Sequence, residues 1–263
     1  MYRRSSLASA LALGMVLASS QASALLITGS SGSLSASADF TIASGNLQVV
    51  LTNTGSPASV PADVLTGLFF SFSGGAILTP VSAALNAGSS IVNCASPDCI
   101  VSTDVGGEWA YATGLSGAPG GTTSGISSAG FGLFGDANFG STNLQGPADN
   151  KPPQSNLAVS GLEFGIVNGE SNPNGGLEKD GEISNSVKFL LSINGNFSLN
   201  NLSKVWFQYG TALTEPGFRG CCIRPPDHSA PEPGVLALLG SALVAWRISQ
   251  RFSRLRGRLD RHS

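Results

Sequence analysis

The stretch that decides the fold class is Ser33-Leu34-Ser35-Ala36-Ser37-Ala38-Asp39-Phe40-Thr41-Ile42. Apolar residues occupy every second position, with polar residues between them, which is the pattern of a half-buried β-strand. The turn-forming residues Ser44-Gly45-Asn46 follow, and Leu47, Val49 and Leu51 then resume the alternation. We therefore predict a β-hairpin over residues 34–51.

The same alternation recurs further along the chain. Residues 65–72 place Leu68, Phe70 and Phe72 on one face of a predicted strand and Phe69 on the other. Further strands are expected at residues 108–113, 159–167, 186–193 and 204–210. The chain has 34 glycines and only 11% charged residues, which is typical of exported β proteins. We predict an all-β fold, a jelly-roll-like two-sheet β-sandwich flanked by an N-terminal signal helix and a C-terminal hydrophobic helix.

The N-terminus has the three parts of a secretory signal peptide. Arg3-Arg4 supplies the positive charge, residues 7–18 form the apolar region, and Ala22-Ser23-Ala24 matches a small-residue cleavage site. We expect export through the general secretion machinery and cleavage by signal peptidase between Ala24 and Leu25. Residues 1–24 are thus assigned to the signal peptide and residues 25–229 to one exported β domain.

The predicted exported domain is acidic. It contains six basic residues against fourteen acidic ones, a net charge of −8, because the other eight basic residues lie in the two terminal segments. An acidic domain lacks the basic surface that nucleic acid requires. We expect no nucleic-acid partner.

The C-terminus carries a signal in three consecutive parts. Pro231-Glu232-Pro233 comes first, and an uncharged apolar run follows at residues 235–246. The basic residues after it are Arg247, Arg251, Arg254, Arg256, Arg258 and Arg261. A helix of this kind inserts into a membrane with its arginines in the cytoplasm, so we expect a transmembrane helix at residues 235–248. The run is shorter than the ~20 residues of an independent span, and a core helix with a basic end is the alternative.

This arrangement closely resembles the PEP-CTERM sorting signal of Gram-negative bacteria, which covers residues 230–263 here. The resemblance implies an integral-membrane protease, exosortase, that recognises Pro231, Glu232 and Pro233 and removes the tail. It implies transient anchoring in the inner membrane, then transfer to the cell surface or an extracellular matrix, with exopolysaccharide as a possible partner. A structural or adhesive role in a biofilm follows from it. In an alternative to this processing, the tail is retained and anchors a periplasmic domain in the inner membrane.

Four cysteines give the exported domain candidate disulfides. Cys94 and Cys99 flank a short loop, and a disulfide that closes it is the first choice in an oxidising compartment. Cys221 and Cys222 are adjacent and could bond to each other, to the first pair or to another chain. The spacing fits no standard zinc motif.

A Gly-rich segment at residues 168–182 concentrates oxygen ligands suited to calcium. The candidates are Glu170, Asn172, Asn174, Asp180 and Glu182. The first three match alternate positions of an EF-hand loop, but its twelfth position falls on Gly181, and no flanking helices are expected. We favour a solvated acidic loop over a calcium site and predict no metal or cofactor.

The domain offers little support for an enzyme. No histidine occurs between Leu25 and Asp227, so the usual nucleophile–histidine arrangements are unsupported. A second hypothesis is a carbohydrate-binding or glycoside-cleaving module that acts on matrix polysaccharide. It would use two carboxylates from Glu108, Glu163 and Glu170 beside Trp109 or Trp206. The simpler interpretation is a strand on which Trp109 and Tyr111 share one packed face.

Overall fold

The computed structural model describes residues 23–94, 102–135, 139, 143–146, 162–169, 177 and 181–224. All of these residues belong to one compact unit that spans residues 22–227. The regular elements within them are strands in two sheets and short 3-10 turns, which confirms the predicted all-β class. The two terminal helices of the prediction lie outside the described residues. None of the helical turns that are described could cross a membrane.

The first sheet has the strand order β14-β1-β2-β3-β11-β5, and every neighbouring pair is antiparallel. Its strands are β1 (Ser23–Ser31), β2 (Leu34–Ala43), β3 (Asn46–Asn53), β5 (Ile77–Leu85), β11 (Ser186–Asn194) and β14 (Cys221–Arg224). The predicted hairpin is confirmed as β2 and β3, joined by a two-residue turn in which Ser44 and Gly45 both have positive φ. Such a turn matches the right-handed twist of its strands.

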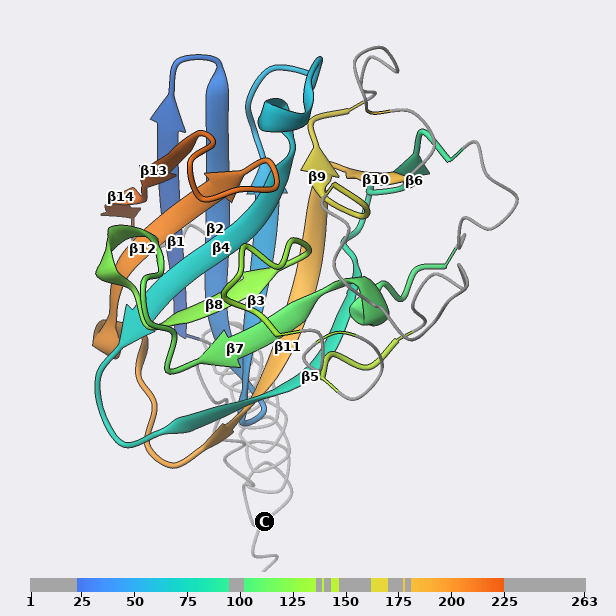
Figure 1. The fold of residues 1–263 in the computed structure, drawn as a ribbon. Coiled ribbons are helices and arrows are strands. Elements are labelled where there is room, and N and C mark those ends of the chain that lie inside the picture. Colours follow the sequence, from blue (N-terminus) through green and yellow to red (C-terminus); the bar gives the residue numbers. More distant parts are fainter. Residues whose placement is uncertain are drawn as a thin grey trace, which may run out of the picture. The chain divides into compact units, whose positions relative to one another are not determined.

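The second sheet runs β13-β12-β4-β9-β10-β6, while β8 also pairs with β4 and β7 with β8. Its strands are β4 (Leu65–Phe72), β6 (Ile91–Val92), β7 (Ala110–Thr113), β8 (Ser124–Ser127), β9 (Ile166–Val167), β10 (Glu182–Ser184), β12 (Leu202–Tyr209) and β13 (Gly217–Arg219). Figure 1 shows β4, β12, β7 and β8 as a layer in front of β1, β2 and β3. The sheet forks at β4, which pairs with β9 at its start and with β8 further along.

The apolar residues of the two sheets meet in one core. Buried positions of β2 alternate with more exposed ones, as the period-two pattern predicts. Phe40 of β2 contacts Phe70 of β4 edge to face, with ring centroids 5.8 Å apart. The hydroxyl of Tyr209 in β12 donates to the carbonyl of Ser35 in β2 at 2.9 Å. Face-to-face packing of the sheets therefore buries the alternating face of each.

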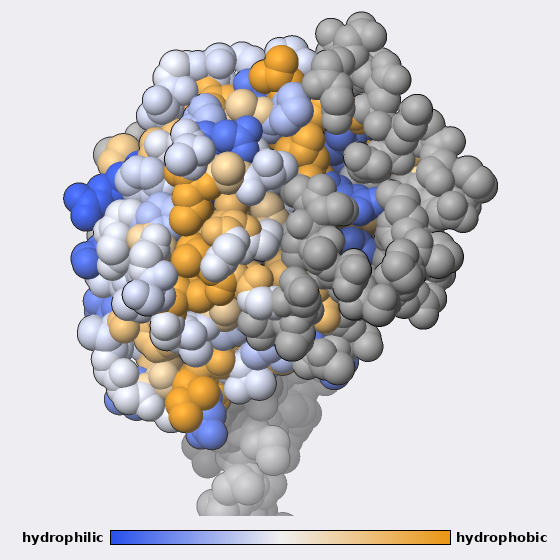
Figure 2. Space-filling view, in the orientation of Figure 1, coloured by the Kyte–Doolittle hydropathy of each residue, from blue (hydrophilic) through white to orange (hydrophobic). Residues whose placement is uncertain are grey.

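The strand β4 is buried on its second face as well. Phe69 points away from the main core, as predicted, and packs against Phe131 and Phe134 with ring centroids 5.9 and 6.0 Å apart. Ala110, Ala118 and Phe139 complete the buried part of this cluster. In Figure 2 apolar residues gather across the middle of this face. The Gly/Ser-rich residues 114–135, which follow β7, thus cover this second face of β4.

The sequence pattern does not predict β1 and β5. β1 carries three apolar residues in succession, Leu25 to Ile27, and β5 contains Pro80. Proline is tolerated there because β5 is an edge strand whose pairing with β11 shifts register beside it. Two predicted strands are shorter than expected. Gly106–Glu108 is a 3-10 turn, so the next strand starts at Ala110, and only Ile166–Val167 is a strand among the described residues of 159–167.

Candidate functional site

The predicted signal-cleavage bond lies at the beginning of the first strand. Ala24 pairs with Thr41 and Leu25 with Phe40 in the β1–β2 ladder, while Ala22 lies outside the described residues. A peptidase needs an extended segment whose backbone is not already paired, so cleavage at this bond must precede the pairing of β1 with β2. The cut would leave residues 25–31 of β1 in place, with Ile27 buried in the core.

The last described strand lies beside the first. β14 pairs antiparallel with β1, with Leu26 opposite Arg224 and Thr28 opposite Cys221. The start of β1 and the end of β14 therefore lie at the same end of the first sheet. The predicted sorting motif 231–233, the predicted transmembrane helix 235–248 and the tail arginines all fall outside the described residues. Six residues, 225–230, separate the motif from β14.

Of the predicted disulfide cysteines, Cys94 is disulfide-bonded. Cys99 lies outside the described residues, so its pairing with Cys94 stays a prediction. Cys221 is exposed on β14, an edge strand of the first sheet, and Cys222 follows it on the same strand. The pairing of these two cysteines likewise stays a prediction.

Only one of the five candidate calcium ligands lies in the described part of the chain. Glu182 opens β10 and is buried. Glu170, Asn172, Asn174 and Asp180 fall outside it. Across the described residues, no group of three or more His, Cys, Asp or Glu side chains could hold a metal ion.

The carbohydrate-site residues do not converge around Trp109. Its side chain is fully buried in the core, where its ring lies 4.9 Å from that of Phe189. Trp109 therefore cannot present a ring face to a sugar, and its use as a sugar platform is wrong. The simpler interpretation is confirmed in part: Trp109 and Tyr111 belong to the same buried cluster, but Trp109 precedes β7 and only Tyr111 lies on the strand. Glu108 is half-buried, at the end of the 3-10 turn.

The other residues proposed for that site are separated between elements. Trp206 is half-buried on β12, and its indole nitrogen donates to the amide oxygen of Gln208 at 3.2 Å. Glu163 is half-buried in the turns before β9, and Glu170 falls outside the described residues. Glu108 and Glu163 therefore lie on separate elements, and the buried Trp109 is not available beside them as a sugar platform.

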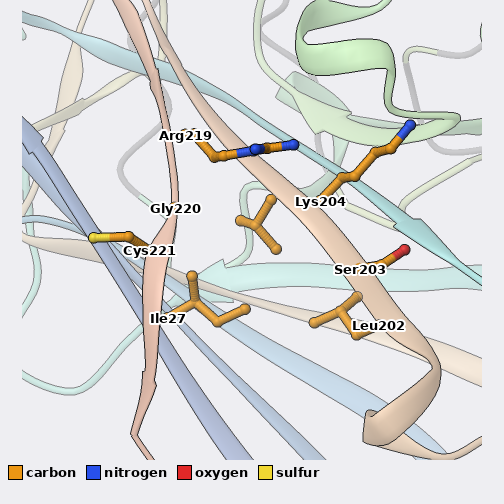
Figure 3. Close-up of a pocket in the computed structure, with 8 residues that line it drawn as sticks. Ile27, Leu202, Ser203, Lys204, Arg219, Gly220 and Cys221 are labelled. Carbon is orange, nitrogen blue, oxygen red and sulfur yellow. The ribbon is translucent and has the colours of Figure 1, made fainter.

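A surface pocket of about 140 Å³ lies where β12 meets β1, β13 and β14. Ile27, Leu202 and Val205 supply its apolar side chains. Lys204 and Arg219 bring two cationic side chains to it, and Figure 3 shows both on one side, with Ile27 and Leu202 on the other. The pocket thus combines an apolar wall with positive charge.

A β-bulge explains why successive residues of β12 line this pocket. Neighbouring side chains of a regular strand point to opposite faces. The pairing of β12 with β4 shifts register between Ser203 and Val205, and Lys204 between them has a φ of 49°. The bulge therefore breaks the alternation, and the Lys204 ammonium donates to the carbonyl of Gly121 at 3.0 Å.

Glycine at position 220 lets the backbone between β13 and β14 pack closely against Ile27 and Val205, which line the pocket. A Cβ atom there would lie 2.6 Å from Cγ2 of Ile27 and 3.2 Å from Cβ of Val205. The site is not visible in the sequence, because Ile27 belongs to the first strand whereas Lys204 and Arg219 belong to strands near the end of the domain. One available signal is that Lys204 and Arg219 are two of only six basic residues in an acidic domain.

No family model, curated protein or solved structure matches this chain. Its function is therefore argued from its own residues.

Proposed function

We propose that this protein is an exported β domain that its C-terminal signal delivers to the cell surface or extracellular matrix, where it has a structural or adhesive role. One observation carries the proposal: apart from Ser23 and Ala24, all residues of the described strands lie between the two expected processing sites. The first strand starts at Ser23, beside the predicted cleavage bond, and the last described strand ends at Arg224, ahead of Pro231. Cleavage at both sites would remove only Ser23 and Ala24 from the described strands.

The short connection to the sorting motif supports the same proposal. Six residues span at most about 20 Å when fully extended. A motif held at the membrane surface would keep the folded domain close to that surface until the tail is cut. The exosortase could then act on the connection without unfolding the domain, because the described strands end before it.

We infer a two-sheet β-sandwich for the domain architecture, but not its jelly-roll-like variant. A jelly roll combines two Greek keys. Here β1, β2 and β3 are consecutive neighbours in one sheet, which is a meander. The contact between Phe40 and Phe70 across the two sheets supports the sandwich.

The sorting proposal is tested by the intact mass of the protein in the culture supernatant, outer surface and inner membrane of its host. We expect a product that starts at Leu25, ends near Pro231 to Pro233 and lies outside the inner membrane. Glu232→Ala should leave the tail attached and hold the protein in the inner membrane. Asp227→Ala, which removes a nearby carboxylate outside the motif, should be processed normally.

Two results would contradict the proposal. A wild-type product that keeps residues 235–263 and occurs only in the inner membrane would establish the anchored periplasmic domain instead. Equal processing of Glu232→Ala and the wild type would show that Pro231-Glu232-Pro233 is not the recognition motif.

A further inference from the structure

We propose that the pocket between β12, β1, β13 and β14 binds one carboxylated sugar ring, of the sugar-acid class. The pocket lies in the folded domain, so this proposal does not depend on how the chain is sorted. It also differs from the glycoside-cleaving hypothesis, because it uses none of the carboxylates named there and involves no reaction.

The charge at the pocket selects an anion. Lys204 and Arg219 line it together, although the exported domain has a net charge of −8. Within the described part of the chain, neither side chain forms an ion pair with a carboxylate. Arginine presents a planar fork that matches the two oxygens of a carboxylate, and lysine adds a point charge. Two such cations on one small pocket favour a carboxylate over a neutral ligand.

The remaining lining selects a ring that carries hydroxyl groups. Ile27, Leu202 and Val205 are core residues that are less than 10% exposed, and their exposed edges form an apolar floor that can contact the C–H face of a sugar. The Ser203 hydroxyl donates to the carbonyl of Ser71 at 3.4 Å, which leaves its oxygen able to accept from a ligand hydroxyl. A volume of about 140 Å³ suits a single ring and is smaller than pockets that enclose drug-sized ligands.

The backbone around the pocket is held in an unusual conformation. Lys204 has a φ of 49°, in the left-handed region that residues other than glycine seldom adopt. Backbone strain of this kind concentrates at functional sites. The bond from the Lys204 ammonium to Gly121 holds the side chain in place and leaves two of its three N–H groups for a ligand. The side chain of Cys221 points away from these residues in Figure 3 and has no part in the proposal.

The experiment is an NMR titration of the full chain in mild detergent with D-glucuronate, followed through the backbone amides. We expect saturable shifts at residues 203–205 and 219–221 with a Kd on the order of 1 mM. D-glucose, which lacks the carboxylate, should bind about tenfold more weakly or worse. Cyclohexanecarboxylate, which lacks the hydroxyls, and inorganic phosphate should also bind more weakly than glucuronate.

Three variants locate the site. Arg219→Gln should weaken glucuronate binding at least about tenfold. Lys204→Gly removes the ammonium and also relieves the positive φ, so it should weaken binding without lowering Tm. Lys188→Gln, which removes an exposed lysine of β11, is the matched control and should bind like the wild type, because β2 and β3 separate β11 from β1 in the first sheet.

Several outcomes would overturn the proposal. If glucose bound as tightly as glucuronate, the two cations would not contribute to binding. If phosphate bound as tightly as glucuronate, the pocket would be a general anion site and not a sugar-acid site. Stronger binding of cyclohexanecarboxylate would assign an apolar acid instead of a sugar acid. The pocket itself would be excluded by shifts confined to other residues, by wild-type affinity in Arg219→Gln and Lys204→Gly, or by the lack of any saturable binding.

Discussion

At the scale of single residues, Asn53 joins the two sheets through its side-chain amide. It is buried at the end of β3, and its amide nitrogen donates to the carbonyl of Ile166 in β9 at 2.9 Å. Its amide oxygen accepts from the backbone N–H of Gly55 at 3.1 Å. The sequence places Asn53 at the start of a loop, but only the folded chain brings it to β9, 113 residues away.

Asn53→Ala should lower the free energy of unfolding by about 2–3 kcal/mol, because the substitution leaves buried backbone groups without their partners. Chemical denaturation measures the change. Asn46→Ala is the matched control, since the Asn46 amide bonds only the exposed carbonyl of Ser44, and it should cost less than about 0.5 kcal/mol. Equal losses in the two variants would contradict the role given to Asn53.

Asp39 makes folding depend on pH. Its carboxylate projects from the outer face of β2 between Leu26 and Val50 on the neighbouring strands. Although the side chain is exposed, partial desolvation by the neighbouring strands raises its pKa above the usual 3.8, opposed by a hydrogen bond from Thr41. The folded protein therefore holds this proton more tightly than the unfolded chain does. The resulting stabilisation is complete below the usual pKa and is lost as pH rises through the raised pKa.

Asp39→Asn should therefore raise Tm at neutral pH, because the amide needs no ionisation at this position. The gain should shrink as the pH falls and disappear below about pH 3, where Asp39 is protonated in both states. Thermal unfolding between about pH 3 and pH 7 tests this. A difference in Tm that does not change with pH would show that packing, and not ionisation, separates the two proteins.

At the scale of elements, the 3-10 turn at Gly106–Glu108 depends on close packing against residues 143–146. The backbone N–H of Gly106 donates to the carboxylate of Asp104 at 3.1 Å, and a Cβ atom on Gly106 would collide with the carbonyl of Gln145. Gln145 in turn pairs with Ser82 of β5. This contact covers the outer edge of the first sheet, which would otherwise expose unpaired backbone groups.

Gly106→Ala should destabilise the domain by about 1–3 kcal/mol, because the added methyl group pushes the Gln145 backbone away. Gly75→Ala is the matched control, since nothing lies within 4 Å of a Cβ atom there. It should leave stability unchanged or raise it by up to about 1 kcal/mol. Urea denaturation distinguishes the two, and equal stability of both variants would show that the turn can shift without cost.

Elements differ in how far the sequence predicts them. β2, β3 and β4 are predictable because each alternates on its own and needs no knowledge of its partner. β5 is not, because its Pro80 is acceptable only at a sheet edge. The short β6, β9 and β10 have two or three residues each, and only long-range pairing makes them strands.

At the scale of the whole molecule, residues 25–229 should fold without the terminal segments. The predicted signal peptide contributes only Ser23 and Ala24 to the described strands, at the beginning of β1. A chain of residues 25–229 should unfold in one cooperative transition. A chain of residues 28–229 should lose about 3 kcal/mol or more, because it also removes Ile27 from the core. Calorimetry compares them, and failure of residues 25–229 to fold would show that the terminal segments support the domain.

The sequence by itself determined the β class, the hairpin of β2 and β3 and the two faces of β4, and it predicts the signals at both ends. These features depend on local periodicity and on short motifs, which need no information about distant residues. Tertiary structure alone decided that β14 pairs with β1, that Trp109 packs against Phe189 and that Ile27, Lys204 and Arg219 share a pocket. These features depend on contacts between strands that are far apart in the chain. Such contacts form only when the two sheets pack together and bury their apolar faces.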